Sequence, residues 1–379
     1  MSSLPETEIL PVLQWEEGDA VRSMRWQSES GVNPPRRVVI ADDTMSADAA
    51  FRLASEGTGL LWRGDYQNAR QLLQAMVRRI ERKPRKTADA PRDAFNLHRQ
   101  AQSQRARTLG MLLMEVSADY TLALRRAPDI RQACNEAYGA GSTPFVVSLR
   151  EILGLIGAHE WRKTGVEIAS LGTKIHPYYG VFSPVRGEYL QLVADAPLPA
   201  RSLAFDIGTG TGVIAALLAQ RGVEQVVATD LDTRAISCAR DNLSRLDLRD
   251  RVEVIQADLF PPGKAPLIVC NPPWIPARPS SAIEHAIYDP DSRMLRGFLQ
   301  GLKAHLAPQG EGWLILSDLA EHLQLRTREE LLQMIEAAGL SVIARLDTRP
   351  VHARASDASD ALHAARSREV TSLWRLAVA

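Results

Sequence analysis

Residues 205–219 read FDIGTGTGVIAALLA, an apolar strand pattern that runs directly into a glycine-rich turn and then into an apolar helix pattern. Glycines in such a turn let the backbone approach a ligand at the carboxyl edge of a parallel sheet. The spacing is GxGxG, not the GxGxxG of dinucleotide-binding proteins, and Asp206 lies two residues before the first glycine. A carboxylate at this point suits a ligand with an ammonium group better than a pyrophosphate, which needs N–H donors. The stretch therefore predicts a small-molecule site at the end of a strand.

From residue 200 to the C-terminus, short β-rich runs alternate with helical patterns, which is typical of a parallel sheet flanked by helices. We expect strands at residues 203–206, 225–229, 252–256, 267–270, 313–317, 341–347 and 372–377. The last two runs lack a crossover helix of the usual length between them, so these strands can pair antiparallel. The predicted fold class is α/β, with a doubly wound, mostly parallel sheet of seven strands.

The chain has room for two domains, each with a core of its own, at 379 residues. Residues 1–160 read mostly as helical patterns, among them 65–77 and 94–124, and predict a mainly helical N-terminal domain that recognises the substrate. Residues 161–199 alternate apolar and polar positions between turn residues, which indicates a β-hairpin and a connector. Residues 200–379 hold the predicted sheet and its ligand site.

Acidic residues follow the second and third expected strands. Asp230 can accept hydrogen bonds from both ribose hydroxyls of a nucleoside. Asp232 is expected to cap the helix that follows. Asp258 can accept from an adenine amino group, and Leu259 or Phe260 can cover the ring. Each acid alone is equally explained as a loop or cap residue, but their order at successive strand ends favours a nucleoside site.

The fourth expected strand ends in NPPW, residues 271–274. The Asn271 side-chain oxygen and the Pro272 carbonyl can accept two hydrogen bonds from one planar NH₂ group, while Trp274 stacks on its face. An amide or aryl-amine nitrogen is a poor nucleophile because its lone pair is delocalised. Two acceptors aimed at its hydrogens favour the pyramidal geometry that attacks a methyl sulfonium in line. A proline pair alone is a stop signal, but behind the glycine loop it indicates transfer to nitrogen.

DIGTGTG, the acid of the second strand, ADLF and NPPW together resemble the Rossmann-like S-adenosyl-L-methionine (SAM) methyltransferases, most of all the HemK/PrmC family of protein-glutamine N5-methyltransferases. The resemblance covers roughly residue 161 to the C-terminus. It implies SAM as cofactor, S-adenosyl-L-homocysteine as product, and methyl transfer to a planar amide or amino nitrogen. The implied catalytic residues are Asn271, Pro272 and Trp274. The implied substrate contacts are Asn271, Pro273, Trp274 and Phe182, the last from a segment (YGVFSP, 179–184) similar to the one ahead of the family's cofactor domain. The implied cofactor residues are Asp206, Gly208, Thr209, Gly210, Gly212, Asp230, Leu231, Asp258, Leu259 and Asn271.

Three features depart from the family pattern. Pro184 is followed by VRGEY, where the family has an arginine, an acid and Thr-Glu. Trp274 replaces the commoner tyrosine, which keeps the ring but changes its polar edge. The N-terminal domain is much longer than the family's small helical substrate domain. The acceptor expected first is a protein glutamine amide, only slightly ahead of the adenine amino group of RNA or DNA, with a small-molecule nitrogen third. A module that only holds SAM is the alternative from another class.

The charge and composition of the chain bear on which classes of partner it can bind. The 45 Lys and Arg are balanced by 45 Asp and Glu, so the whole chain gives no argument for a nucleic-acid or membrane partner. Between Arg78 and Arg107, ten basic residues stand against three acids, which either track phosphates or form a solvated helix face. Cys134, Cys238 and Cys270 are far apart, and no His/Cys cluster predicts a metal. No export signal or membrane-length apolar run is visible, so we expect a cytoplasmic protein.

Overall fold

The computed structural model describes residues 11–82, 86, 88–141, 143–184, 187–279, 284, 286–350, 357 and 360–379. The chain divides into two compact units. Unit 1 comprises Met1–Lys86 and Arg99–Glu160, and unit 2 comprises Thr87–His98 and Trp161–Ala379. None of the helices in the described part of the chain combines the length and the apolar character that a membrane span requires.

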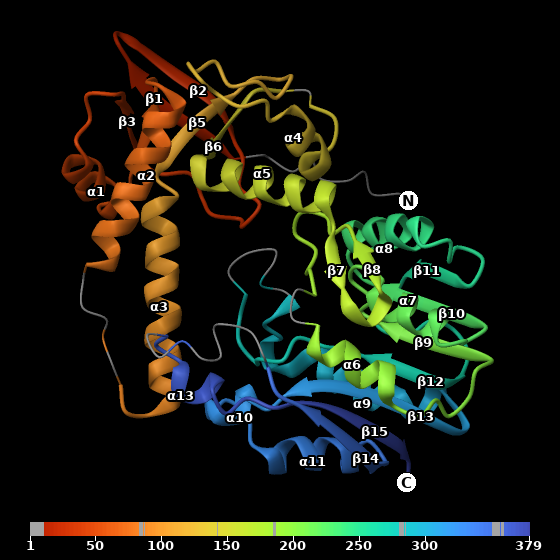
Figure 1. The fold of residues 1–379 in the computed structure, drawn as a ribbon. Helices are drawn as coiled ribbons and strands as arrows, with labels where there is room; N and C mark the ends of the chain where they lie inside the picture. Colours follow the sequence, from red (N-terminus) through yellow and green to blue (C-terminus); the bar gives the residue numbers. More distant parts are fainter. Residues whose placement is uncertain are drawn as a thin grey trace, which may run out of the picture. The chain divides into compact units, whose positions relative to one another are not determined.

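Unit 1 is built on a six-stranded sheet with the order β1-β2-β6-β5-β4-β3 (Figure 1). Its strands are β1 (Val12–Glu17), β2 (Ala20–Trp26), β3 (Arg37–Ala41), β4 (Thr58–Trp62), β5 (Leu112–Val116) and β6 (Phe145–Ser148). Its helices are α1 (Ala47–Ser55), α2 (Tyr66–Glu81), the C-terminal part of α3 (Pro91–Leu109), α4 (Arg131–Tyr138) and most of α5 (Leu149–Thr164). Strands β3, β4 and β5 are parallel, whereas β6 runs antiparallel to β5.

This sheet corrects the expectation of a mainly helical N-terminal domain, because unit 1 is α/β. The sequence pattern did not indicate these strands because several are short and buried on both faces. Every residue of β4 is buried, and a short run of this kind lacks the alternation that distinguishes a strand from a buried helix segment. The predicted helix over 94–124 is also wrong in its second half, because α3 ends at Leu109 and β5 begins at Leu112.

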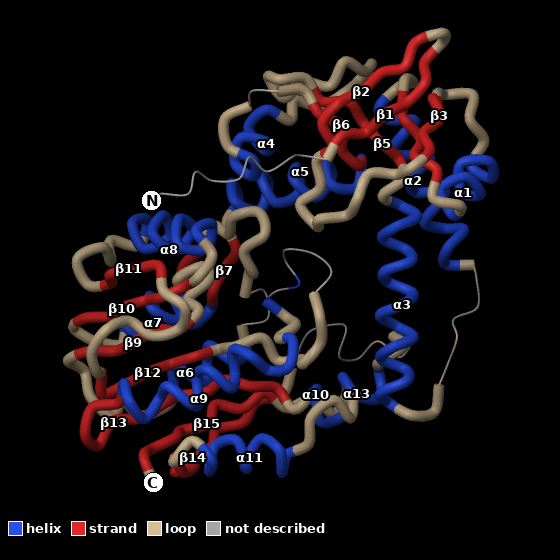
Figure 2. Tube along the Cα trace, turned by 180° about the vertical axis from the view of Figure 1, so that it is seen from behind, coloured by secondary structure: helices blue, strands red, loops and turns tan. Residues whose placement is uncertain are grey.

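Unit 2 contains a seven-stranded sheet with the order β11-β10-β9-β12-β13-β15-β14 (Figure 2). Its strands are β9 (Leu203–Ile207), β10 (Gln225–Asp230), β11 (Val252–Gln256), β12 (Ala265–Cys270), β13 (Leu306–Ser317), β14 (Leu340–Thr348) and β15 (Thr371–Val378). Strand β15 is antiparallel to both neighbours, and the remaining pairs are parallel. The seven expected strands and the antiparallel pairing of the last two are confirmed.

A small hairpin and a set of helices complete unit 2. The hairpin pairs β7 (Val166–Ile168) with β8 (Thr173–Ile175) around the 3-10 turn η1 (Ala169–Leu171), as the alternation predicted. The helices and the second 3-10 turn are α6 (Glu188–Asp195), α7 (Val213–Gln220), α8 (Thr233–Arg245), η3 (Pro290–Ser292), α9 (Arg293–His305), α10 (Leu319–His322), α11 (Arg328–Ala337) and α13 (His363–Arg366).

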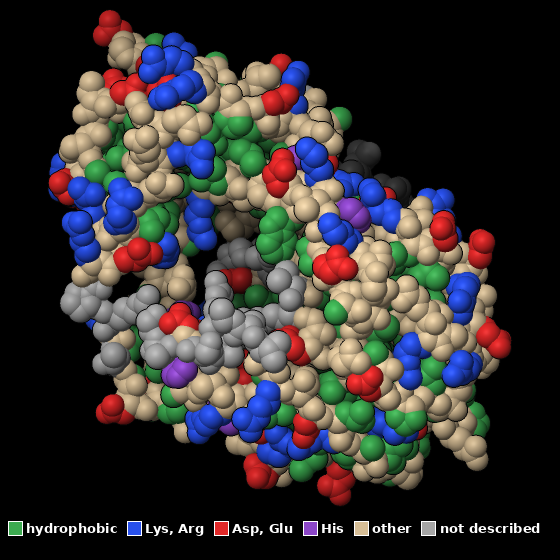
Figure 3. Space-filling model, viewed as in Figure 1, with side chains coloured by type: hydrophobic (Ala, Val, Ile, Leu, Met, Phe, Trp, Pro, Cys, Tyr) green, Lys and Arg blue, Asp and Glu red, His purple; other side chains and the backbone are tan. Residues whose placement is uncertain are grey.

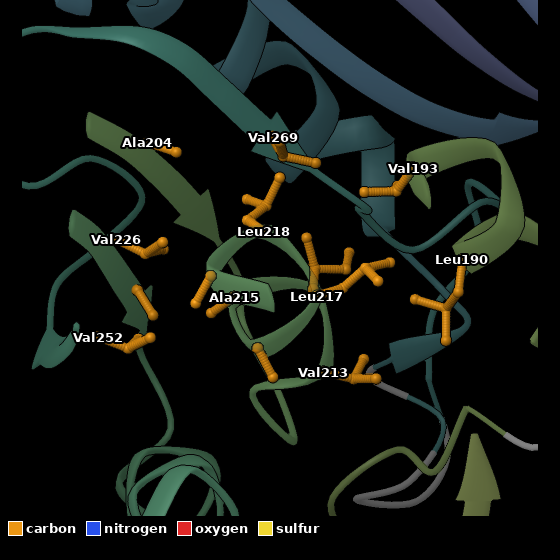
Figure 4. Close-up of a cluster of buried hydrophobic side chains, with 14 of the residues drawn as sticks. Leu190, Val193, Ala204, Val213, Ala215, Leu217, Leu218, Val226, Val252 and Val269 are labelled. Carbon is orange, nitrogen blue, oxygen red and sulfur yellow. The ribbon is translucent and has the colours of Figure 1, made fainter. Parts of the chain in front are cut away.

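The central strand β9 sends alternate side chains to two apolar clusters. Ala204 belongs to the cluster around α7, whereas Phe205 and Ile207 belong to the cluster around α9. Helix α7 is buried over all of 213–219, and Figure 4 shows its side chains among those of the neighbouring strands and α6. Because side chains alternate along a strand, Asp206 faces the α7 side of the sheet. The carboxylate is thereby placed beside the N-terminus of that helix.

Candidate active site

Asp206 lies at the end of β9 and is fully buried. Its Oδ2 accepts hydrogen bonds from Thr209 Oγ1 at 2.6 Å and from the Ala215 backbone N–H at 3.0 Å. Its Oδ1 is buried and has no hydrogen-bond partner among the described residues. Burial raises the pKa of Asp206 to about 7, although both hydrogen bonds oppose the rise. One carboxylate oxygen is therefore anchored by the glycine loop and α7, and the other has no partner in the described part of the chain.

The glycine loop after β9 uses backbone conformations that side chains rarely adopt. Gly208, Gly210 and Gly212 have φ values of +72°, +55° and +81°. A Cβ added at Gly208 would approach Met294 Cε to 2.4 Å, whereas a Cβ at Gly210 would meet no atom within 4 Å. The Thr209 N–H donates to the Thr229 carbonyl at 2.8 Å and so ties the loop to β10. Gly210 thus leaves open space on a loop that is otherwise held in place.

Asp230 ends β10 next to this loop. Its Oδ2 accepts from the Gly210 N–H and its Oδ1 accepts from the Asp232 N–H, both at 3.0 Å. Burial raises the pKa of Asp230 from its ordinary value. Leu231, the next residue, is 57% exposed, which is unusual for a leucine at a strand end. Asp232 accepts from the Arg234 N–H at 2.8 Å and caps α8, which confirms its expected role.

The three residues after Ala257, which follows β11, have different surroundings. Asp258 is exposed and its carboxylate pairs with Arg293 Nη2 at 2.8 Å. Phe260 stacks on His305, with ring centroids 4.3 Å apart, and so packs against α9. Leu259 instead lines a cavity of about 600 Å³ together with residues of η3 and α9. Of the two side chains expected to cover an adenine ring, only Leu259 remains available.

Asn271 follows β12 and is oriented by two aromatic residues. The indole Nε1–H of Trp274 donates to Asn271 Oδ1 at 2.9 Å. Tyr189, from α6, meets the Trp274 ring edge-on with centroids 6.4 Å apart. Burial raises the pKa of Tyr189, and a hydrogen bond with Asn271 partly opposes this rise. Pro272 is buried and Pro273 is half-buried beside them. The site therefore brings together the predicted NPPW residues and one tyrosine that the motifs did not identify.

Tyr189 and Asp289 make contacts near the site that the sequence motifs did not assign to them. Tyr189 lies in the VRGEY segment, whose departure from the family pattern was the available signal. Asp289 accepts from the N–H groups of Met294 and Leu295 and caps α9. Phe182 is half-buried in the connector between β8 and α6, and its substrate contact stays a prediction. Among the described residues, no group of three or more His, Cys, Asp or Glu side chains is arranged to hold a metal ion.

Residues 189–338 match the family model described as "Methyltransferase small domain". This part of unit 2 is therefore similar to the methyltransferase small domain. A release factor glutamine methyltransferase of Cereibacter sphaeroides is 33% identical over 161 residues, which are 38% of this chain and 55% of that protein. A tRNA1(Val) (adenine(37)-N6)-methyltransferase of Bacteroides thetaiotaomicron is 32% identical over 136 residues, 33% of this chain and 56% of that protein. The chain thus spans somewhat more than half the length of these curated relatives.

Solved methyltransferase structures are also similar to the chain over about half its length. One is a methyltransferase of Pyrococcus furiosus, with a TM-score of 0.39 and 19% identity over 58% of this chain and 96% of that one. Another is a SAM-dependent methyltransferase of Thiobacillus denitrificans in complex with S-adenosyl-L-homocysteine, with a TM-score of 0.37 and 15% identity over 52% of this chain and 92% of that one. The match of the methyltransferase small domain and its curated relatives confirm the resemblance to Rossmann-like methyltransferases that the motifs predicted.

Proposed function

We propose that this protein transfers the methyl group of SAM to a planar amide or amino nitrogen of a macromolecular acceptor. The observation that carries the proposal is the Asn271 carboxamide, held by Trp274 Nε1 at the end of β12. Strands β12 and β9 are neighbours in the sheet, so Asn271 lies next to the glycine loop that follows β9. Of the two curated relatives reported above, one is named for the methylation of a glutamine and the other for the methylation of adenine at N6, and both names support the same reaction class.

The residues at the sheet edge fit SAM. Asp206 Oδ1 is a buried oxygen without a partner in the described part of the chain, and an ammonium group would supply the missing donor. Asp230 would accept from the ribose hydroxyls, and the exposed Leu231 would cover the adenine together with Leu259. The space beside Gly210 lets the cofactor approach the backbone. When bound, SAM supplies a methyl group on a positively charged sulfonium, whose carbon–sulfur bond breaks as the nitrogen attacks.

Asn271 and Pro272 would act on the acceptor nitrogen. The Asn271 oxygen has two lone pairs, of which the Trp274 N–H uses one, so a second hydrogen bond from the acceptor NH₂ remains available. The Pro272 carbonyl would accept the other hydrogen of the same group. These two acceptors favour the localised lone pair that attack requires, and the site then works by orientation. The proton leaves to solvent after transfer, so no dedicated base is needed.

The acceptor has two candidate classes. A protein glutamine amide corresponds to the function named for the Cereibacter relative, and an adenine amino group corresponds to that named for the Bacteroides relative. Both present a planar NH₂ group to the same pair of acceptors. Basic residues of α2 favour the adenine class: Arg78 and Arg82 are exposed, and basic side chains gather in Figure 3 over the part of unit 1 where Figure 1 places α1 and α2.

The test is transfer of label from methyl-tritiated SAM into a cell extract that is then separated into protein, RNA, DNA and small molecules. We expect label in one macromolecular fraction with the wild type, loss of that label with Asn271→Ala, and no loss with Asn68→Ala, a matched asparagine of unit 1. Asn271→Ala should still bind SAM. Binding of SAM without label in any fraction would overturn the proposal in favour of a module that only holds the cofactor.

A further inference from the structure

Arg326 is a buried cation without a partner. It is 5% exposed, and its Nε and Nη2 atoms are both buried without a hydrogen-bond acceptor among the described residues. These two nitrogens form the side of the guanidinium group whose parallel N–H bonds match a carboxylate or a phosphate. A buried, uncompensated charge is costly, and arginine keeps its charge at any ordinary pH. The described residues therefore supply no acceptor for this fork, and an anion would match its charge.

The carboxylates around Arg326 are already engaged elsewhere. Asp289, Glu321 and Glu330 are close enough to influence the pKa of Arg326 electrostatically. Asp289 caps α9, Glu321 pairs with Arg328 at 2.7 Å, and Glu330 accepts from the Thr327 N–H in the capping box of α11. None of the three forms an ion pair with Arg326. Arg326 is thus left unpaired because its acidic neighbours serve other groups.

Arg326 lies beside the proposed acceptor site. It follows α10, which begins just after the end of β13, the neighbour of the strand that carries Asn271. Leu323 and Leu325 belong to an apolar cluster that also holds Ile275, and Trp274 packs against this cluster. Asp289 links the two sides, because its N–H donates to the Ile275 carbonyl while its carboxylate acts on Arg326. The unpaired fork therefore lies near the apolar cluster that Trp274 and Ile275 extend from NPPW.

Two exposed arginines lie close in the sequence to residues of this apolar cluster. Phe95, from the part of α3 that belongs to unit 2, packs with Ile275 in the cluster, and Arg92 lies one turn before it and is exposed. Arg278 follows Ala277, which packs against the cluster, and is also exposed. Separate cations along one surface match an anion that repeats along a chain better than a single peptide carboxylate.

We propose that the Nε/Nη2 fork of Arg326 binds a backbone phosphate of a nucleic-acid methyl acceptor, next to the base whose amino group Asn271 receives. This rests on the proposed function and selects its adenine class. Hydrogen bonds from a buried guanidinium to phosphate would satisfy a charge that the fold leaves unpaired, and they would position the backbone without reading its sequence. Two groups would then orient the acceptor, the fork at the phosphate and the carboxamide at the base.

The test is fluorescence anisotropy of a labelled single-stranded oligoribonucleotide of adenosine and uridine, with S-adenosyl-L-homocysteine present at saturation and with salt as a variable. Arg326→Gln is expected to weaken binding roughly 10- to 100-fold and to lower the slope of log affinity against log salt by about 0.7, the value for one phosphate contact in a single strand. Arg326→Lys keeps the charge without the fork and should fall between the two. Arg249→Gln, an exposed arginine near the amino end of β11, should match the wild type.

A measurement of stability distinguishes phosphate binding by Arg326 from a purely structural role. Because Arg326→Gln removes a buried unpaired charge, its urea midpoint should equal or exceed that of the wild type. A lowered midpoint, unchanged oligonucleotide binding, or binding too weak to measure in the wild type would overturn the proposal. Label transfer into protein alone would also overturn it while leaving methyl transfer intact. Failure to bind SAM would instead refute the proposed function, and the anisotropy comparison does not depend on turnover.

Discussion

Asp206→Asn should make the protein more stable at high pH while it weakens cofactor binding. Burial raises the pKa of Asp206 to about 7 from the ordinary 3.8. Between these values the folded protein holds a proton on Asp206 that the unfolded chain has lost. Stability therefore falls as the pH rises through this range, because ionising the folded carboxyl costs free energy. Above pH 7 the accumulated cost is on the order of 4 kcal/mol, and asparagine does not have it.

The pH dependence isolates this cost from the hydrogen bonds. An asparagine oxygen in place of Oδ2 can accept from both Thr209 and Ala215, whereas its NH₂ group would take the place of the unpartnered Oδ1. Leaving that amide unpaired costs about 1–3 kcal/mol, but this cost does not change with pH. From pH 5 to pH 8, the unfolding free energy of Asp206→Asn relative to the wild type should therefore rise by about 3 kcal/mol.

Urea unfolding at pH 5 and pH 8, without added cofactor, measures this difference, and calorimetry with SAM measures the affinity at both pH values. The wild-type affinity should rise with pH as Asp206 ionises to meet the ammonium group, whereas that of Asp206→Asn should be weaker and flat. Thr233→Ala, at the first position of α8 and outside the site, serves as a control with no pH-dependent difference. Equal pH dependence of stability in the wild type and Asp206→Asn would refute the inferred burial of an ionisable group.

Two further variants test the loop and the carboxamide. Trp274→Phe keeps the ring but removes the N–H that donates to Asn271 Oδ1, so kcat should fall roughly 3- to 10-fold while the KM for SAM stays unchanged; a change confined to that KM would contradict the positioning role. Gly208→Ala and Gly210→Ala both place a side chain at positive φ and should each cost about 1–2 kcal/mol of stability in urea unfolding. Gly210→Ala should also abolish SAM binding in calorimetry beyond its effect on stability, since its Cβ enters the open space of the loop; a wild-type SAM affinity in this variant would contradict that assignment.

The sequence predicted where the candidate site residues that belong to local motifs lie in the fold. The glycine loop, the strand-end acid Asp230 and the NPPW tetrapeptide are contiguous patterns, and each lies at the carboxyl edge of the sheet where its strand ends. The sequence did not predict in which direction each side chain points. Nothing in ADLF distinguishes Leu259, which lines the cavity, from Phe260, which packs on α9. The strands of unit 1 were missed for a related reason, since β4 is buried at every position and shows no alternation.

Tyr189 and Arg326 show a second limit. Tyr189 reaches Asn271 only because α6 packs against the sheet, a contact between residues more than 80 positions apart. Arg326 is one of 45 basic residues, and no local pattern marks it as buried. It is buried in the turn between α10 and α11, and it is unpaired because three nearby acids serve other donors. Both properties depend on tertiary packing and not on any sequence period.

The order of these groups along the sheet edge differs from their order in the sequence, and this difference explains how one edge can serve a two-substrate reaction. Strand neighbours place Asp230, then Asp206, then Asn271 along the edge, followed by the β13 end that leads to Arg326. With about 4.8 Å between neighbouring strands, the edge from β10 to β13 spans roughly 14 Å. Nucleoside, ammonium, acceptor nitrogen and acceptor anion would follow the same order. Under the proposed function the acceptor would enter from the β13 side, so the segments after β12 and β13, rather than the glycine loop, would determine which nitrogen is methylated.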